Sequence, residues 1–189
     1  MKTVRFTTMK DGTRADYQLL AEESLKYNAN HVDKVLDLLK ALAGDPRGYQ
    51  IDRYQHSLQT ATRAMRDGVD EEMIVCALLH DIGDDYAPMN HAAFAAEVLR
   101  PYVSKENHWL VEKHGVFQGY YFWHHYGMDR NAREKYRGHP CFERTAEFCE
   151  RWDQTAFDPA YDTAPLETFE PMVRRIFARE PYGLLSADT

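Results

Sequence analysis

Cysteine is scarce in this chain of 189 residues: only Cys76, Cys141 and Cys149 are present, and no two of them form a CxxC pair. Such spacing fits neither a disulfide framework nor a zinc site built from paired thiolates. We therefore expect three buried thiols in a reducing compartment.

The chain also lacks long apolar runs and an excess of positive charge. No segment approaches the roughly 20 apolar residues that cross a bilayer, and the first segment, MKTVRFTTMKDGTRADY, contains no apolar signal-peptide core. With 23 Lys and Arg against 30 Asp and Glu, the net charge is −7, which disfavours binding to a phosphate backbone. We expect a cytoplasmic protein with no nucleic-acid, membrane or obligate protein partner.

Helical periodicity runs through most of the chain. Apolar residues recur at spacings of three and four, no segment alternates for long at period two, and repeats, low-complexity tracts and Gly/Ser linkers are missing. A hydrophobic content of 44% and a charged content of 28% are typical of a globular protein. We predict an all-α fold and a single domain over residues 1–189, with a core at about 50–155 and a helical extension at about 13–43 that Asn28 and Asn30 divide.

Caps and breakers predict where the helices after this extension lie. Asp70 and Ser104 suit N-cap positions, GDPRG at 44–48 separates the extension from the core, and Pro171 is expected to interrupt the last helix. The expected helices cover about 51–66, 70–83, 89–99, 104–122, 130–136, 141–155 and 165–179.

The strongest chemical signal is His80-Asp81, which follows the apolar run IVCALL and precedes Ile82-Gly83. Adjacent side chains of a helix point about 100° apart and do not face each other. Both can still bind metal if two ions or a bridging carboxylate lie between helices. Further residues of ligand type lie on or at the ends of other expected helices: His56, His91, His114 and Asp153.

Four imidazoles and two carboxylates form a ligand set that is typical of iron or manganese, and the lack of paired cysteines argues against structural zinc. Six ligands with one bridging carboxylate would suit two metal ions and leave positions open for substrate or oxygen. Each residue alone also has a simpler explanation: a satisfied or surface histidine, a charge on a helix surface, or a polar pair that only caps a core helix. The ordered set across four or five helices favours the metal site.

These residues carry a resemblance to a known family. The segments YQHSLQTA, ALLHDIG and RWDQ resemble the H…HD…D pattern of the HD-domain superfamily, whose fold is a helical bundle around a metal site. The segments MNHAA and EKHGV resemble the two extra histidines of its mixed-valent di-iron oxygenases, the PhnZ/TmpB-like phosphonate oxygenases. The resemblance covers about residues 50–155.

The resemblance implies a ligand set and a reaction. It implies that one iron is bound by His56, His80, Asp81 and Asp153, and that a second is bound by His91 and His114 with Asp81 bridging. It implies an Fe(II)/Fe(III) pair, with O2 as co-substrate, that cleaves the C–P bond of a small 1-hydroxylated organophosphonate. The candidate substrate is (R)-1-hydroxy-2-(trimethylammonio)ethylphosphonate, which would give glycine betaine and phosphate. His80 and Asp81 would be catalytic.

Residues 117–140 are dense in aromatic and basic side chains that suit such a substrate. Tyr121 and Trp123 either belong to the core or form a pocket wall, where aromatic faces attract quaternary ammonium groups. Arg130 and Arg133, one helical turn apart, either form a solvated face or clamp a phosphonate. Tyr49 is expected near the metals by the resemblance.

Gln118 marks a departure from the resemblance. It lies four residues after His114, where PhnZ-like proteins have a lysine that handles the phosphonate, so an aminoethylphosphonate substrate is not favoured. Its amide can instead hydrogen-bond a substrate hydroxyl. Asp84 and Asp85 are expected in a solvated loop.

Two other functions stay open at this point. A metal-dependent HD phosphohydrolase would use two ions to polarise a nucleotide or phosphomonoester and to supply a hydroxide nucleophile. A non-catalytic helical domain would keep the fold without turnover.

Overall fold

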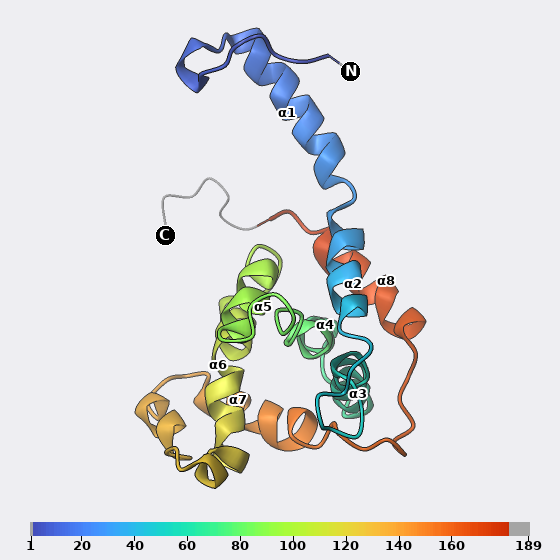
Figure 1. The fold of residues 1–189 in the computed structure, drawn as a ribbon, viewed down its shortest axis with the longest axis vertical. Helices are drawn as coiled ribbons and strands as arrows, with labels where there is room; N and C mark the ends of the chain where they lie inside the picture. Colours follow the sequence, from blue (N-terminus) through green and yellow to red (C-terminus); the bar gives the residue numbers. More distant parts are fainter. Residues whose placement is uncertain (1, 182–189) are drawn as a thin grey trace. The chain divides into compact units, whose positions relative to one another are not determined.

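A computed structural model describes residues 2–181, and every regular element in this range is helical. The predicted all-α class is therefore confirmed. The α-helices are α1 (Arg14–Asn28), α2 (His31–Ala41), α3 (Arg53–Arg66), α4 (Glu71–Leu79), α5 (His91–Leu99), α6 (Lys105–Phe122), α7 (Phe142–Phe148) and α8 (Leu166–Phe177) (Figure 1). The shorter elements are 3-10 turns at Met9–Asp11, Trp123–Tyr126 and Ala132–Tyr136, and a π-helical turn at Cys149–Asp153.

The chain divides into two compact units, one up to Asp37 and one from Leu38. In the first unit, α1 begins at a capping box: the Thr13 hydroxyl accepts from the Asp16 N–H at 3.3 Å, and the Asp16 carboxylate accepts from the Thr13 N–H at 2.9 Å. The helix ends at Asn28, so the expected division before α2 is confirmed. A single domain over the whole chain stays a prediction.

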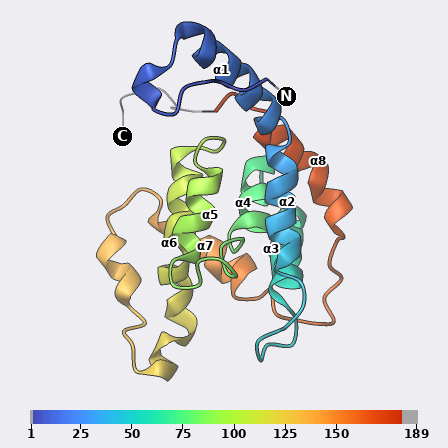
Figure 2. The same cartoon turned by 45° about the horizontal axis from the view of Figure 1, so that its top comes forward.

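In the second unit, α4 forms the centre of the bundle. All residues from Met73 to Leu79 are buried, as expected for a helix that is apolar on every face. Helix α4 packs against α3 and α8, while α6 packs against α5 and α7 (Figure 2). Burial of each Leu or Ile side chain contributes about 1.5–3 kcal/mol, so α4 holds its C-terminal end firmly inside the unit.

Helix α8 corrects one expectation, because it continues through Pro171 without a break. A proline in the second turn removes one intrahelical hydrogen bond. The buried face of the helix compensates for this loss, since Leu166, Phe169, Val173 and Ile176 repeat at helical spacing and are all buried.

Two further helices end earlier than expected. Helix α4 stops at Leu79 rather than near residue 83, and α7 stops at Phe148 and passes into the π-helical turn. Both early ends occur beside the candidate metal ligands. Among the helices of residues 2–181, none combines the length and apolar character needed to cross a membrane.

Candidate metal centre

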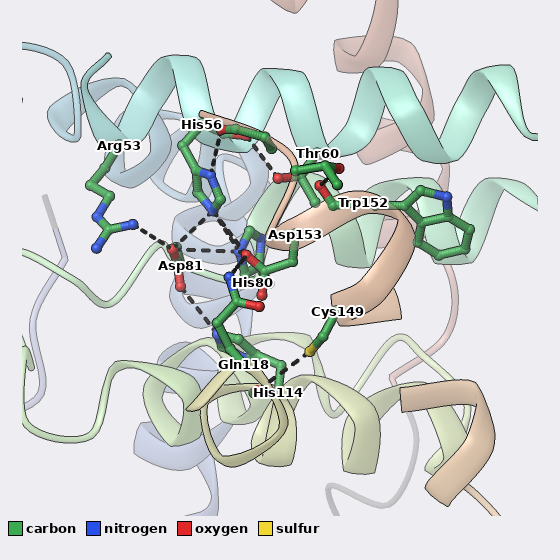
Figure 3. Close-up of polar contacts among 12 residues, drawn as sticks. Arg53, His56, Thr60, His80, Asp81, His114, Gln118, Cys149, Trp152 and Asp153 are labelled. Atoms are coloured by element: carbon green, nitrogen blue, oxygen red, sulfur yellow. Dashed lines mark hydrogen bonds and ion pairs between the residues drawn. The ribbon is translucent and has the colours of Figure 1, made fainter. Parts of the chain in front are cut away.

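The structure brings all six predicted ligands into one cluster between the helices of the second unit, and Figure 3 labels all of them except His91. The contributing residues are His56 on α3, His80 at the C-cap of α4, Asp81 in the following turn, His91 at the start of α5, His114 on α6 and Asp153 at the end of the π-helical turn. All are buried except His91, whose side chain is 27% exposed.

The early end of α4 explains how two adjacent residues face one centre. On a continuing helix their side chains would diverge by about 100°. His80 instead caps the helix and Asp81 lies in the turn beyond it. The His80 Nε2 and Asp81 Oδ2 atoms consequently lie 3.4 Å apart.

Three of the imidazoles are oriented by backbone carbonyls. The Nδ1 atoms of His56, His80 and His114 lie 2.9, 2.8 and 2.7 Å from the carbonyl oxygens of Ala156, Ala77 and Val111. A carbonyl oxygen only accepts hydrogen bonds, so each Nδ1 carries the proton and donates it. The lone pair of each Nε2 is left to face the centre, which is the arrangement of metal-binding histidines.

This tautomer leaves two lone pairs opposed in the cluster. The Nε2 atoms of His56 and His80 are 3.2 Å apart, and with both Nδ1 atoms protonated neither Nε2 can donate to the other. A shared cation relieves this repulsion. The nitrogen and carboxylate donors, without a thiolate among them, fit iron or manganese.

Asp81 lies between two groups of histidines and divides its oxygens between them. Its Oδ2 is 3.5 Å from His56 Nε2 and 3.4 Å from His80 Nε2, while its Oδ1 is 3.4 Å from His91 Nε2 and 3.2 Å from His114 Nε2. Such a carboxylate can bridge two cations.

We name two positions from this division. The first position is surrounded by His56, His80, Asp81 Oδ2 and Asp153 Oδ1, which is 3.3 Å from His56 Nε2 and 3.7 Å from His80 Nε2. The second position is surrounded by His91, His114 and Asp81 Oδ1. Donor atoms of His80, His114 and Asp153 also lie within 4.8 Å of one another, so the two positions adjoin.

The electrostatics of the cluster require positive charge. Burial alone would raise the pKa of Asp153, but the imidazoles of His56 and His80 hold it below its ordinary value. Asp81 behaves likewise: burial opposes ionisation, and His80, His114 and His91 lower its pKa. Although burial disfavours a charged His80, Asp81 and Asp153 raise its pKa. Protons or metal ions must therefore accompany the carboxylates.

The π-helical turn places Asp153 in the cluster. The Gln154 N–H donates to the Cys149 carbonyl at 3.0 Å, five residues back, and the Trp152 indole N–H donates to Asp67 at the end of α3 at 2.6 Å. Gln118 Nε2 donates to Asp153 Oδ1 at 3.0 Å. Asp153 Oδ2 and Gln118 Oε1 are buried and have no hydrogen-bond partner in the described part of the chain, so they are available to a cation or a ligand.

A pocket of about 480 Å³ opens beside the cluster. Asp81, His91, His114 and Asp153 line it, whereas His56 and His80 do not. The second position therefore faces the pocket, and the first lies behind it. Four of the residues predicted to bind substrate also line the pocket: Tyr49, Gln118, Tyr121 and Trp123.

The HD domain family model matches residues 53–153, which span more than half of the chain and include the whole cluster. This chain belongs to the HD domain family. No curated protein matches it. Membership assigns the chain to a superfamily of metal-dependent hydrolases and oxygenases, and its buried His/Asp cluster is suited to metal ions.

Two residues predicted to bind substrate lie elsewhere in the HD domain. Arg130 and Arg133 do not line the pocket, and their guanidinium carbons lie 4.2 and 3.7 Å from the ring centre of Tyr120. Arg133 belongs to the 3-10 turn Ala132–Tyr136, and Arg130 precedes that turn.

Arg53 is an arginine that lines the pocket, and the sequence patterns did not predict it. Its guanidinium lies 2.9 Å from Asp84 Oδ2 and 3.8 Å from Asp81 Oδ2. Arg53 precedes His56 by three residues, so one turn of α3 puts both on the same face. The spacing of three residues between Arg53 and His56 was the signal in the sequence that could have predicted this residue.

The expectation of a solvated loop is wrong for Asp84, whose residue is only 7% exposed. Asp84 Oδ1 lies 3.5 Å from His91 Nδ1. Gly83 makes this approach possible, since a Cβ there would lie 2.7 Å from the His91 carbonyl oxygen. Asp85, with a side chain 30% exposed, forms an ion pair with Arg47.

The chain between Asp153 and α8 passes along α3 and forms part of the pocket wall. Both atoms of the Gln59 amide bond the backbone of Asp158, at 2.8 and 3.2 Å. The ring of Phe157 stacks on His56 at 4.4 Å and on Tyr49 at 5.0 Å between centroids. Sequence patterns carried no signal for this stack, because it depends on the path of an irregular segment.

The three cysteines are buried thiols, as predicted. Burial raises the pKa of the Cys149 thiol well above its ordinary value, and its Sγ donates to the His114 carbonyl oxygen at 3.5 Å. Cys149 therefore supports the backbone of α6 as a neutral thiol.

Proposed function

We propose that this HD domain binds two iron ions and oxidises a small 1-hydroxylated organophosphonate with O2. The division of the Asp81 oxygens between two groups of histidines carries the proposal. An enzyme with a single ion would need only one of these groups, whereas a bridging carboxylate between two nitrogen-rich positions suits a pair of redox-active ions.

His56, His80 and Asp153 would hold the first iron, His91 and His114 would hold the second, and Asp81 would bridge them. When bound, an Fe(II)/Fe(III) pair would supply the activation of O2 and the oxidation of the substrate. His80 and Asp81 would act catalytically as ligands, because they fix where the ions stand relative to the pocket.

The overall reaction balances with one O2. The candidate substrate, (R)-1-hydroxy-2-(trimethylammonio)ethylphosphonate, would lose its C–H and C–P bonds at the hydroxylated carbon. That carbon gives up four electrons to O2. One oxygen atom ends in the carboxylate of glycine betaine and the other in phosphate, and one proton is released.

Two polar residues of the pocket suit the phosphonate and the hydroxyl group of such a substrate. Arg53 presents guanidinium N–H groups to the phosphonate. Gln118 already donates to Asp153, and its free Oε1 can accept from the substrate hydroxyl. Arg53 therefore takes the role first considered for Arg130 and Arg133, which lie outside the pocket wall.

The aromatic wall suits the trimethylammonium group. Tyr49, Tyr121, Trp123 and Phe157 line the pocket, and each good contact between a quaternary ammonium and an aromatic face contributes about 0.5–2 kcal/mol. These contacts would bind the trimethylammonium group without the need for a negatively charged partner.

The test combines metal content with stoichiometry of turnover. Protein purified without oxygen and loaded with iron should contain two irons, show a mixed-valent electron-spin signal, and consume one O2 per phosphate released from the hydroxyphosphonate. Replacing His91 with Ala should leave one iron and abolish both the mixed-valent signal and the oxygen-dependent release of phosphate.

Other outcomes would reject the oxygenase. Phosphate release from nucleotides or phosphomonoesters without oxygen uptake would establish a phosphohydrolase instead. Two tightly bound ions without turnover of either substrate class would indicate a non-catalytic domain.

A further inference from the structure

Asp84 connects the second position to two arginines. One of its oxygens faces His91 Nδ1 at 3.5 Å, and the other lies 2.9 Å from Arg53 Nε and 3.8 Å from Arg47 Nη1. The carboxylate is thus held from one side by two cations and presents its remaining oxygen to the imidazole.

Arg47 reaches this network in an unusual backbone conformation. Its φ is +50°, in the left-handed region that is unfavourable for a residue with a side chain. The Arg47 N–H donates to Asp45 at 2.8 Å, and its guanidinium pairs with Asp84 and Asp85. These interactions offset the cost and fix the loop before α3 against the turn after Asp81.

His91 is the imidazole that most needs such support. It is the most exposed of the four, and it begins α5 after Asn90, which makes no side-chain capping bond. The other three imidazoles have a backbone carbonyl at Nδ1, whereas the partner of His91 Nδ1 within residues 2–181 is the Asp84 side chain. Its orientation therefore depends on one carboxylate.

We propose that Asp84 is a positioning residue that sets the occupancy of the second position. By accepting a hydrogen bond from His91 Nδ1–H, it selects the tautomer whose Nε2 lone pair faces Asp81, and its negative charge raises the basicity of that nitrogen. This inference rests on the two-ion site of the proposed function. It concerns metal binding and does not depend on the reaction.

The experiment compares Asp84→Ala and Asp84→Asn with Asp85→Asn, a matched control in the same turn. Apo-protein is titrated with Fe(II) without oxygen, and the ions bound after dialysis are counted by elemental analysis. Asp84→Ala should bind the first ion as the wild type does and the second about 10- to 100-fold more weakly, the usual effect of removing a partner of a metal-bound histidine. Asp84→Asn should also weaken only the second ion, and Asp85→Asn should match the wild type.

A general loss of structure would weaken both ions, so the ratio of the two affinities is the diagnostic quantity. If Asp84→Ala does not fold, Asp84→Asn decides by the same ratio. An unchanged ratio in a folded Asp84 variant would overturn the inference while leaving the proposed function intact. A wild type that binds one ion would overturn both, and two ions without oxygen uptake would overturn only the reaction.

Discussion

The two positions of the centre differ in how the chain holds them. His56 and His80 at the first position are buried, oriented by backbone carbonyls, and absent from the pocket wall. His91 at the second position is partly exposed, oriented by a side chain, and faces the pocket. Under the proposed function, an ion at the first position would be held inside the bundle and an ion at the second position would meet the ligand.

The comparison is sharpest between His80→Ala and His91→Ala. Removing His80 takes a donor from the buried position and weakens the compensation of both Asp81 and Asp153, so we expect loss of both ions and a protein that unfolds more easily. Removing His91 should leave one ion and change the free energy of unfolding by less than about 1 kcal/mol. Metal analysis and urea denaturation measure both effects. Equal losses in the two variants would contradict the division into positions.

Removing both ions should have the next largest effect. Four imidazoles and two carboxylates are costly to bury without cations. At ion concentrations 100 to 1,000 times Kd, binding of one ion stabilises the fold by about 2.7–4.1 kcal/mol, so chelation of the first ion alone corresponds to a fall in Tm of roughly 5–16 °C for a chain of this size. Calorimetry with confirmed metal loss measures the change, and an unaltered Tm would argue against a central site.

Gln59→Leu should destabilise only the segment that lies beside the first position. It removes both hydrogen bonds to the Asp158 backbone, which are part-buried, at a cost of about 1 kcal/mol. The control is Gln154→Leu, because that amide donates at an exposed site to the Glu150 carbonyl. Urea denaturation should separate the two variants, and a Gln59→Leu protein as stable as the control would show that the segment after Asp153 needs no such anchor.

Glu72→Gln, remote from both positions, should give the smallest change. Burial opposes its ionisation, but the Ser104 N–H, Arg179 and Asn107 hold its pKa below the ordinary value. A lowered folded-state pKa adds stability above the unfolded value of about 4.3, and this is lost as the pH falls through the folded value. Wild type should therefore exceed the variant by about 1 kcal/mol at pH 7, and the gap should close below about pH 4. A stability difference that does not change with pH would contradict the lowered pKa of Glu72.

The sequence predicted the helical class and the members of the cluster because both leave local signals. The N-caps at Asp70 and Ser104 are confirmed by side-chain bonds to Met73 and Asn107, and ligand-type residues stand out on otherwise apolar helices. Their common location then follows from packing around α4.

What the sequence did not predict depends on irregular backbone. The burial of Asp84 requires the close approach of Gly83 to α5, and the stack of Phe157 on His56 requires the path of the chain along α3. Charge and spacing alone predicted Arg130 and Arg133 as substrate-binding residues, but both contact the Tyr120 ring and neither lines the pocket. None of these outcomes has a periodic pattern.

The π-helical turn makes the location of Asp153 sensitive to a single residue. A π turn contains one residue more than the α turn it replaces, and each residue of an α-helix advances the side-chain direction by about 100°. A regular α-helix through the same residues would therefore rotate the carboxylate away from His56 and His80. The wider turn is thus itself a determinant of where Asp153 lies, although no side chain of the centre would be altered.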